Sequence, residues 1–323
     1  MKETLDGCYA QPEAVARALR FGGRLSNEKV LLDSLDNKFE LLSEIKHMTL
    51  SACGSSLNAA RYAECLMKSI DAFNCVDTID ASDPEVSGIF SCYNDEPKRN
   101  GLIVVSQKDQ AQHVHTIAKS AMAKNIACLS VAGSIGSLVA PITNLSTHLN
   151  ALKENAVASN EALTTQVTAL ALVALWFRQT KDIIEGRKLM YVESKKLKES
   201  LMRLPIILGK IIKMTRPQCK QVAERLQDKR HCVVVGQGYG ESVAMEGALK
   251  IKETCNIRAE GHIGDDVKHC TLINNNDMKL RCIPIIMLIF DDEHASHMRT
   301  VAKDVKARGF ELIIITDKKK YSL

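Results

Sequence analysis

The sequence predicts an α/β protein built from two doubly wound units with parallel sheets. Short apolar runs alternate with segments of helical periodicity, which is the pattern of a parallel sheet covered by helices on both faces. The second half of the chain repeats the order of the first, and a segment rich in Lys and Glu joins them. The chain has 323 residues, which is enough for two cores of roughly 100–200 residues each.

In the first half, short apolar runs predict the strands and amphipathic or apolar stretches predict the helices. We expect strands at 48–53, 75–79, 102–106 and 126–131, and helices at 57–69, 112–123 and 160–177. The most apolar window, 167–177, has about half of the ~20 residues that a membrane-spanning helix needs. It therefore predicts a buried helix.

The charged segment 181–203 predicts an exposed helical connector that ends at Pro205, because proline breaks the helical hydrogen-bond ladder. Beyond it we expect strands at 232–235, 283–289 and 311–316, and helices at 241–254 and 294–307. The predicted organisation is an N-terminal entry segment 1–35, a first domain 36–180, the connector 181–205 and a second domain 206–323.

Composition excludes several classes of protein. The net charge of +5 is spread thinly along the chain, since Lys and Arg alternate with Asp and Glu, and aromatic residues make up only 4%. A nucleic-acid-binding protein would need a denser basic surface and more aromatic side chains for base stacking. The N-terminus lacks the apolar segment of a signal peptide, so no membrane association is expected. The 11 cysteines are odd in number and form no CxxC pair. They predict buried, reduced thiols and a cytoplasmic protein.

Two predicted strands end in turns of small polar residues that lead into a helix. The first turn contains Ser55 and Ser56, and the second contains Ser106 and Gln107. Such turns present N–H groups, hydroxyls and a helix N-terminus to an anion such as a sugar phosphate. Ordinary helix capping is the alternative interpretation. A third turn, 236–242, has the spacing GxGxG, which is not the dinucleotide fingerprint GxGxxG.

The densest polar cluster comprises Lys250, Glu253 and the segment 260–269, which ends in His269. A carboxylate and an imidazole in one pocket can move a carbon-bound proton and open a hemiacetal. The alternative is an exposed i, i+3 ion pair beside a loop histidine. The cluster His262, Asp265, Asp266 and His269 matches no recognised metal motif, and we expect neither a metal ion nor an organic cofactor.

Several motifs together resemble the isomerase half of the glutamine:fructose-6-phosphate amidotransferase (glucosamine-6-phosphate synthase) family. Residues 245–253, MEGALKIKE, are nearly the family's LEGALKIKE, and 52–56, ACGSS, resemble its ACGTS. Further similarities lie at 11–13 (EQPE in the family), 106–107 (start of SQSGET), 154–159 (EIGVAS) and 201–205 (connector). The resemblance implies two SIS-type (sugar isomerase) αβα sandwich domains.

The same resemblance implies roles for individual residues. Glu253 matches the carboxylate that shuttles a proton between C1 and C2, His269 the ring-opening histidine, and Lys250 a lysine of the same pocket. The positions that hold the phosphate and hydroxyls of fructose 6-phosphate match Ser55, Ser56, Ser106, Gln107, Val157 and Ser159. In the family the histidine enters the neighbouring subunit's site, so a homodimer is implied.

The chain also departs from the family pattern. SQSGET is here Ser106 followed by QKDQA, and the residues after His269 differ as well. We expect no glutaminase domain and no lysine-bearing C-terminal tail, so that ammonia would come from a separate source. Two functions are compatible with this pattern: isomerisation or amination of fructose 6-phosphate, with glucosamine 6-phosphate as the aminated product, or a catalytically inactive sugar-phosphate-binding or regulatory module.

Overall fold

The computed structural model describes residues 2–26, 29–83, 96–106, 112–133, 140–143, 145–148, 160–187, 192–269 and 282–318. The chain forms two compact units, Met1–Ile212 and Lys213–Leu323. Each unit contains one sheet, and every described strand pair within the two sheets is parallel. The prediction of an α/β protein with parallel sheets is therefore confirmed.

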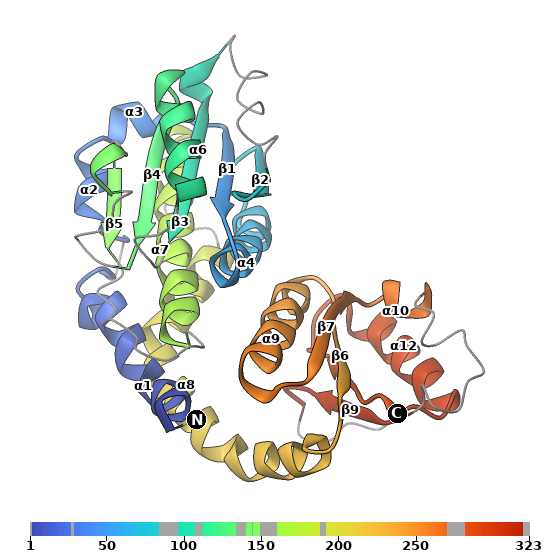
Figure 1. The fold of residues 1–323 in the computed structure, drawn as a ribbon. Coiled ribbons are helices and arrows are strands. Elements are labelled where there is room, and N and C mark those ends of the chain that lie inside the picture. The colour runs from blue at the N-terminus through green and yellow to red at the C-terminus, as the bar shows by residue number, and fades with distance from the viewer. Residues whose placement is uncertain are drawn as a thin grey trace. The chain divides into compact units, whose positions relative to one another are not determined.

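The sheet of the first unit has the strand order β2-β1-β3-β4-β5 (Figure 1). Its strands are β1 His47–Ala52, β2 Cys75–Asp80, β3 Asn100–Ser106, β4 Ala127–Ala132 and β5 Leu145–His148. The central strands β3 and β4 bury every residue, as the apolar runs predicted. The edge strand β5 was not predicted, because its sequence LSTH carries a single apolar residue.

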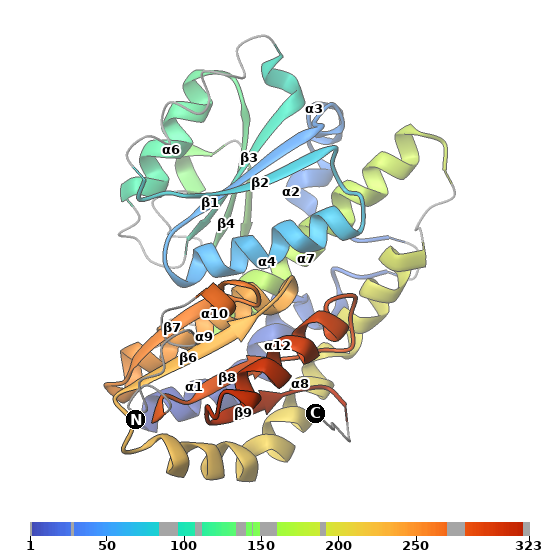
Figure 2. The ribbon, with the colours of Figure 1, turned by 90° about the vertical axis from the view of Figure 1, so that its right-hand side faces the viewer.

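Helices cover both faces of this sheet (Figure 2). Helices α4 (Ser55–Ser69) and α7 (Glu161–Ile184) lie on one face, and α6 (Gln112–Ala123) packs against Leu102, Val104 and Cys128 on the other. The sequence did not predict α1 (Lys2–Ala18), which packs on α7, or the short helices α2 (Asp33–Asp36) and α3 (Phe39–Ser43). Short 3-10 turns lie at Arg20–Gly22, Pro97–Arg99 and Ala140–Ile142.

Helix α7 is the buried helix that the apolar window predicted. All residues from Ala169 to Phe177 are buried, so the helix is apolar around its whole circumference, as an enclosed core helix must be. The indole Nε1 of Trp176 donates a hydrogen bond to Asp36 Oδ1 at 2.8 Å.

Helix α8 (Val192–Leu226) corrects the prediction that the connector ends at Pro205, because Pro205 and Pro217 both lie inside it. Each proline removes one N–H from the ladder. The Leu, Met, Arg and Lys residues around Pro205 have favourable helix propensities, and the helix continues through both positions.

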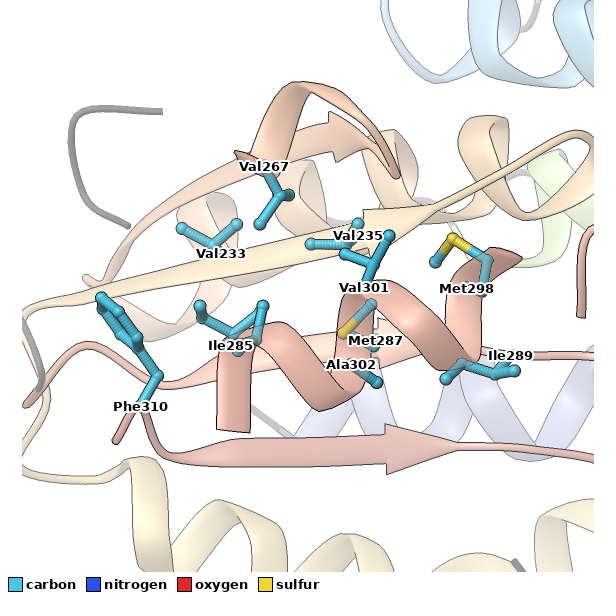
Figure 3. Packing of buried hydrophobic residues seen from close by; sticks show 11 residues of the cluster. Val233, Val235, Val267, Ile285, Met287, Ile289, Met298, Val301, Ala302 and Phe310 are labelled. Carbon is cyan, nitrogen blue, oxygen red and sulfur yellow. The ribbon is translucent and has the colours of Figure 1, made fainter. Parts of the chain in front are cut away.

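The sheet of the second unit has the order β7-β6-β8-β9. Its strands are β6 His231–Gly236, β7 Arg258–Ile263, β8 Ile285–Leu288 and β9 Leu312–Ile315. Helix α9 (Tyr239–Cys255) packs on one face through Ala244 and Ala248. Helices α10 (Asp266–His269) and α12 (Ala295–Ala307) pack on the other, where Val267, Met298 and Val301 meet the side chains of β6 and β8 (Figure 3).

The cysteine prediction is only partly right. Among the described cysteines, which are all free thiols, Cys128 and Cys232 are buried. The exposed ones are Cys75, Cys219, Cys255 and Cys282, and the remaining three are half-buried. Several lie at the ends of helices and strands, where an apolar sequence neighbourhood does not ensure burial.

Within the described ranges, no helix is long and apolar enough to cross a membrane.

Candidate functional site

The strand order of the first unit creates a topological switch point between β1 and β3. From β1 the chain crosses to β2 on one side, and it then returns to form β3 on the other side. In open parallel sheets the connections diverge at such a point and leave a crevice at the carboxyl ends of the two strands. Ser55 and Ser56 come shortly after β1, and Ser106 is the last residue of β3, so the fold brings these serines to the same edge of the sheet.

The turn between β1 and α4 is open on the outside. Gly54 is the N-cap of α4, with φ 59° and ψ −136°, a conformation that favours glycine. Apart from its two chain neighbours, no described residue has an atom within 4 Å of the position that a Cβ on Gly54 would occupy. Ser55 and Ser56 then begin α4, whose first turn carries N–H groups that have no carbonyl partner within the helix.

Ser56 faces inward and contacts a residue that the sequence analysis did not single out. Ser56 is 8% exposed, and its Oγ accepts a hydrogen bond from Gln166 Nε2 of α7 at 2.9 Å. Gln166 itself is 1% exposed. The sequence carries a signal for this contact, because the polar group Thr164-Thr165-Gln166 lies within an otherwise apolar helix.

Ser106 is the last residue of β3 and is buried. Ser51 of β1 pairs with Val104 of β3, so that continuing the register places Cys53 level with Ser106. The structure thus brings Ser106 to the same edge as Ser55 and Ser56. The other predicted contacts, Gln107, Val157 and Ser159, lie outside the described residues.

Cys53, between the strand and the open turn, is held as a neutral thiol. Burial and the nearby carboxylate of Asp80 both raise the pKa of Cys53 above its usual value. Because the thiolate is the nucleophilic form of cysteine, this environment disfavours covalent chemistry at Cys53.

In the second unit, the structure pairs Lys250 with Glu253 as their spacing predicts. Lys250 Nζ lies 2.9 Å from Glu253 Oε2 and 3.3 Å from Glu246 Oε1. Glu246 is buried, whereas the Glu253 side chain is 30% exposed. The ammonium therefore anchors the carboxylate of Glu253 near the C-terminal end of α9 while leaving it accessible.

The structure does not bring Glu253 and His269 together within this unit. Glu253 lies on α9 and His269 ends α10, and these helices pack on opposite faces of the sheet. Val267, two residues before His269, belongs to the cluster on the α12 face (Figure 3). The side chain of His269 lies outside what the structure describes.

The second sheet has the same type of switch point, between β6 and β8, but a side chain fills it. Gly238 caps α9 with φ 58° and ψ −122°, nearly the conformation of Gly54. A Cβ on Gly238 would lie 2.6 Å from Nε2 of His294, the residue that precedes α12. The equivalent positions thus differ: the first unit leaves its turn open, and the second covers it with an imidazole.

Other histidines at this edge form separate pairs with carboxylates. His297 Nε2 lies 3.0 Å from Asp265 Oδ1, and His262 Nε2 lies 3.4 Å from Glu260 Oε2. Among the residues that the structure describes, no group of three or more His, Cys, Asp or Glu side chains is arranged to hold a metal ion.

Comparison with known proteins identifies relatives of the chain. Residues 225–323 match the family model of the SIS domain. The chain is 30% identical over 315 residues to the isomerizing glutamine–fructose-6-phosphate aminotransferase of Pseudomonas putida, and 27% identical over 322 residues to that of Escherichia coli. The C-terminal domain of glucosamine-fructose-6-phosphate aminotransferase from Francisella tularensis has a similar structure, with a TM-score of 0.84 and 26% identity. The resemblance to the isomerase half of these aminotransferases is confirmed.

The similarity to the aminotransferases extends over both units. The two sequence matches cover 96% of this chain and 48% of each relative, so the chain spans about half the length of these aminotransferases. The structural match covers 98% of this chain and 84% of the Francisella domain. The SIS model by itself begins at the last two residues of α8 and matches only the second unit.

Proposed function

We propose that the chain binds a phosphorylated sugar of the fructose 6-phosphate class at the β1/β3 switch point of its first unit. The observation that carries this proposal is the open turn at Gly54, from which Ser55 and Ser56 begin α4 beside the end of β3. Backbone N–H groups at a helix N-terminus and nearby hydroxyls are the donors that a phosphate requires. The covered turn at Gly238 disfavours the second unit as the phosphate site.

We further propose that both units are SIS-type domains, 36–180 and 206–323, although the family model matches only the second. Two observations support this. In each sheet, the strand that comes first along the chain lies between the second and the third strand of that unit. The glycines that come after the first strand of each sheet also share nearly the same backbone conformation.

The proposed reaction is the isomerisation or amination of the bound sugar. His269 would transfer the ring proton and open the hemiketal to the C2 ketone. Glu253 would then move a proton from C1 to C2 while the hydroxyl proton of O1 passes to O2, which converts the ketose to the aldose. If ammonia has first condensed with the C2 ketone and released water, the same transfer from C1 to C2, with the O1 proton passing to the imine nitrogen, gives glucosamine 6-phosphate. Lys250 would hold the Glu253 carboxylate in place.

A homodimer would complete this reaction centre. Because the sheet separates α9 from α10 in one chain, we propose that Glu253 acts together with His269 of the partner subunit.

A second candidate function is binding without turnover. It is favoured by the sequence QKDQA after Ser106, which replaces the Ser, Gly and Thr of the family's phosphate loop and adds Asp109, whose charge would repel a phosphate.

The test is turnover of fructose 6-phosphate by the purified chain, with and without ammonium, followed as glucose 6-phosphate and glucosamine 6-phosphate. Product that is lost in Glu253→Gln but retained in Glu224→Gln, an exposed glutamate of α8, supports catalysis. Saturable binding without product supports the binding module. The absence of binding would overturn both functions.

A further inference from the structure

A buried polar contact lies directly behind the proposed phosphate turn. Gln166 of α7 is 1% exposed, and its Nε2 lies 2.9 Å from Ser56 Oγ at the start of α4. The helix around it is apolar, with Ala169 and Leu170 fully buried. A buried amide in such surroundings requires a polar partner, and Ser56 is the partner of its nitrogen.

The direction of this hydrogen bond determines what Ser56 can offer to a ligand. Gln166 Nε2 is a donor, so Ser56 Oγ is the acceptor and the hydroxyl proton is available for another acceptor. On the other side of the amide, Gln166 Oε1 is buried and has no hydrogen-bond partner among the described residues. If the amide were turned over, Oε1 would accept the hydroxyl proton of Ser56, and that proton would no longer be available.

We infer that Gln166 is a positioning residue that keeps Ser56 as a hydrogen-bond donor toward the phosphate of the sugar. This inference rests on the proposed function, because Ser56 has such a role only if an oxyanion occupies the turn. The orientation with the amide nitrogen on Ser56 leaves Oε1 without a partner among the described residues, which is unfavourable in a buried site. A bound oxyanion compensates by accepting the serine proton, so ligand binding selects this orientation.

The test is a set of double-mutant cycles on fructose 6-phosphate affinity, measured by calorimetry. Ser56→Ala is made in the wild type, in Gln166→Met and in Gln166→Glu. The carboxylate of Gln166→Glu accepts the Ser56 proton, so in that background the serine has no proton to give. We expect Ser56→Ala to weaken binding about tenfold or more in the wild type, and less than twofold both in Gln166→Met, which lacks the donor that orients the serine, and in Gln166→Glu. A merely structural role of Gln166 predicts the same loss in the wild type and in Gln166→Met, and that result would overturn the inference.

The side-chain amide of Gln166 provides a second readout if Gln166→Glu does not fold. Its NMR signals are assigned as the pair that disappears in Gln166→Met. Titration with fructose 6-phosphate is expected to shift these signals in the wild type and not in Ser56→Ala. If the wild type binds the sugar without any shift, the positioning role is wrong and the proposed function stands. If the wild type does not bind, the proposed function is wrong and the role of Gln166 is wrong with it.

Discussion

Arg178 and Asp182 lie one turn apart on α7 and form an ion pair whose side chains are only 3% and 0% exposed. Arg178 also pairs with Asp71 at 2.9 Å, and so it joins α7 to the chain that comes after α4. Arg178 and Asp182 are enclosed by the core, where an uncompensated charge is strongly unfavourable, whereas Asp71 is exposed.

We expect Asp182→Ala to lower the free energy of unfolding by about 1–3 kcal/mol, because it removes the buried carboxylate of the Arg178 guanidinium and leaves only the more exposed Asp71 as its ionic partner. Urea denaturation measures the loss. The matched control is Glu185→Ala, which breaks the more exposed pair with Arg187 and should cost less than about 1 kcal/mol. Equal losses in the two variants would contradict the structural importance of the buried pair.

Alanine at the two capping glycines should distinguish the open turn from the covered one. Gly54→Ala introduces backbone strain of about 1–3 kcal/mol, but its methyl group meets no atom of the described residues within 4 Å, its chain neighbours apart. Gly238→Ala adds a contact with His294 at 2.6 Å to the same strain, so it should lower the urea midpoint further. His294→Ala should recover this additional loss in Gly238→Ala, and a failure to do so would show that His294 does not cover Gly238 in solution.

Cys128 predicts a loss of stability in alkaline solution. Burial raises the pKa of the Cys128 thiol from 9.0 to about 12. Between these values the folded chain keeps a proton that the unfolded chain releases, so this contribution to stability falls as the pH rises above about 9. Unfolding measured from pH 8 to 10.5 should show a shallower decline in Cys128→Ala, while the exposed Cys219→Ala should behave as the wild type.

The loop after Ser106 can be tested by restoring the family's residues. Lys108→Ser, Asp109→Gly, Gln110→Glu and Ala111→Thr together recreate SQSGET. Two additional neutral hydrogen bonds, each of ~0.5–1.5 kcal/mol, should tighten fructose 6-phosphate binding about ten- to a hundredfold. An unchanged Kd would mean that this loop does not hold the phosphate in this protein.

The sequence predicted those elements whose side chains are buried in a periodic pattern. β3 and β4 are mainly apolar and buried along their whole length, and α7 is the longest apolar stretch. The edge strand β7 was missed, because its residues RAEGHI include a single buried side chain and therefore lack both the apolar run and the alternation of a strand. Helix α1 was missed because it contains Pro12 and is polar over much of its length.

The candidate site was predictable only in part, for a related reason. Ser55 and Ser56 follow a recognisable strand and Ser106 ends another, so parallel topology alone predicts their convergence. The contact of Gln166 with Ser56 joins residues 110 positions apart, and the packing of α7 on α4 determines it. The separation of Glu253 from His269 likewise depends on which face of the sheet each helix covers, which their own sequences do not encode.

The sheet that stands between α9 and α10 has a genetic consequence. If each reaction centre takes Glu253 from one chain and His269 from the other, two defective alleles can complement one another. Chains with Glu253→Gln and chains with His269→Asn would each be inactive, yet a mixed pair keeps one intact centre. With random assortment of equal amounts, the mixture should regain about a quarter of the wild-type rate. A mixture that remains inactive would mean that every chain builds its centre alone.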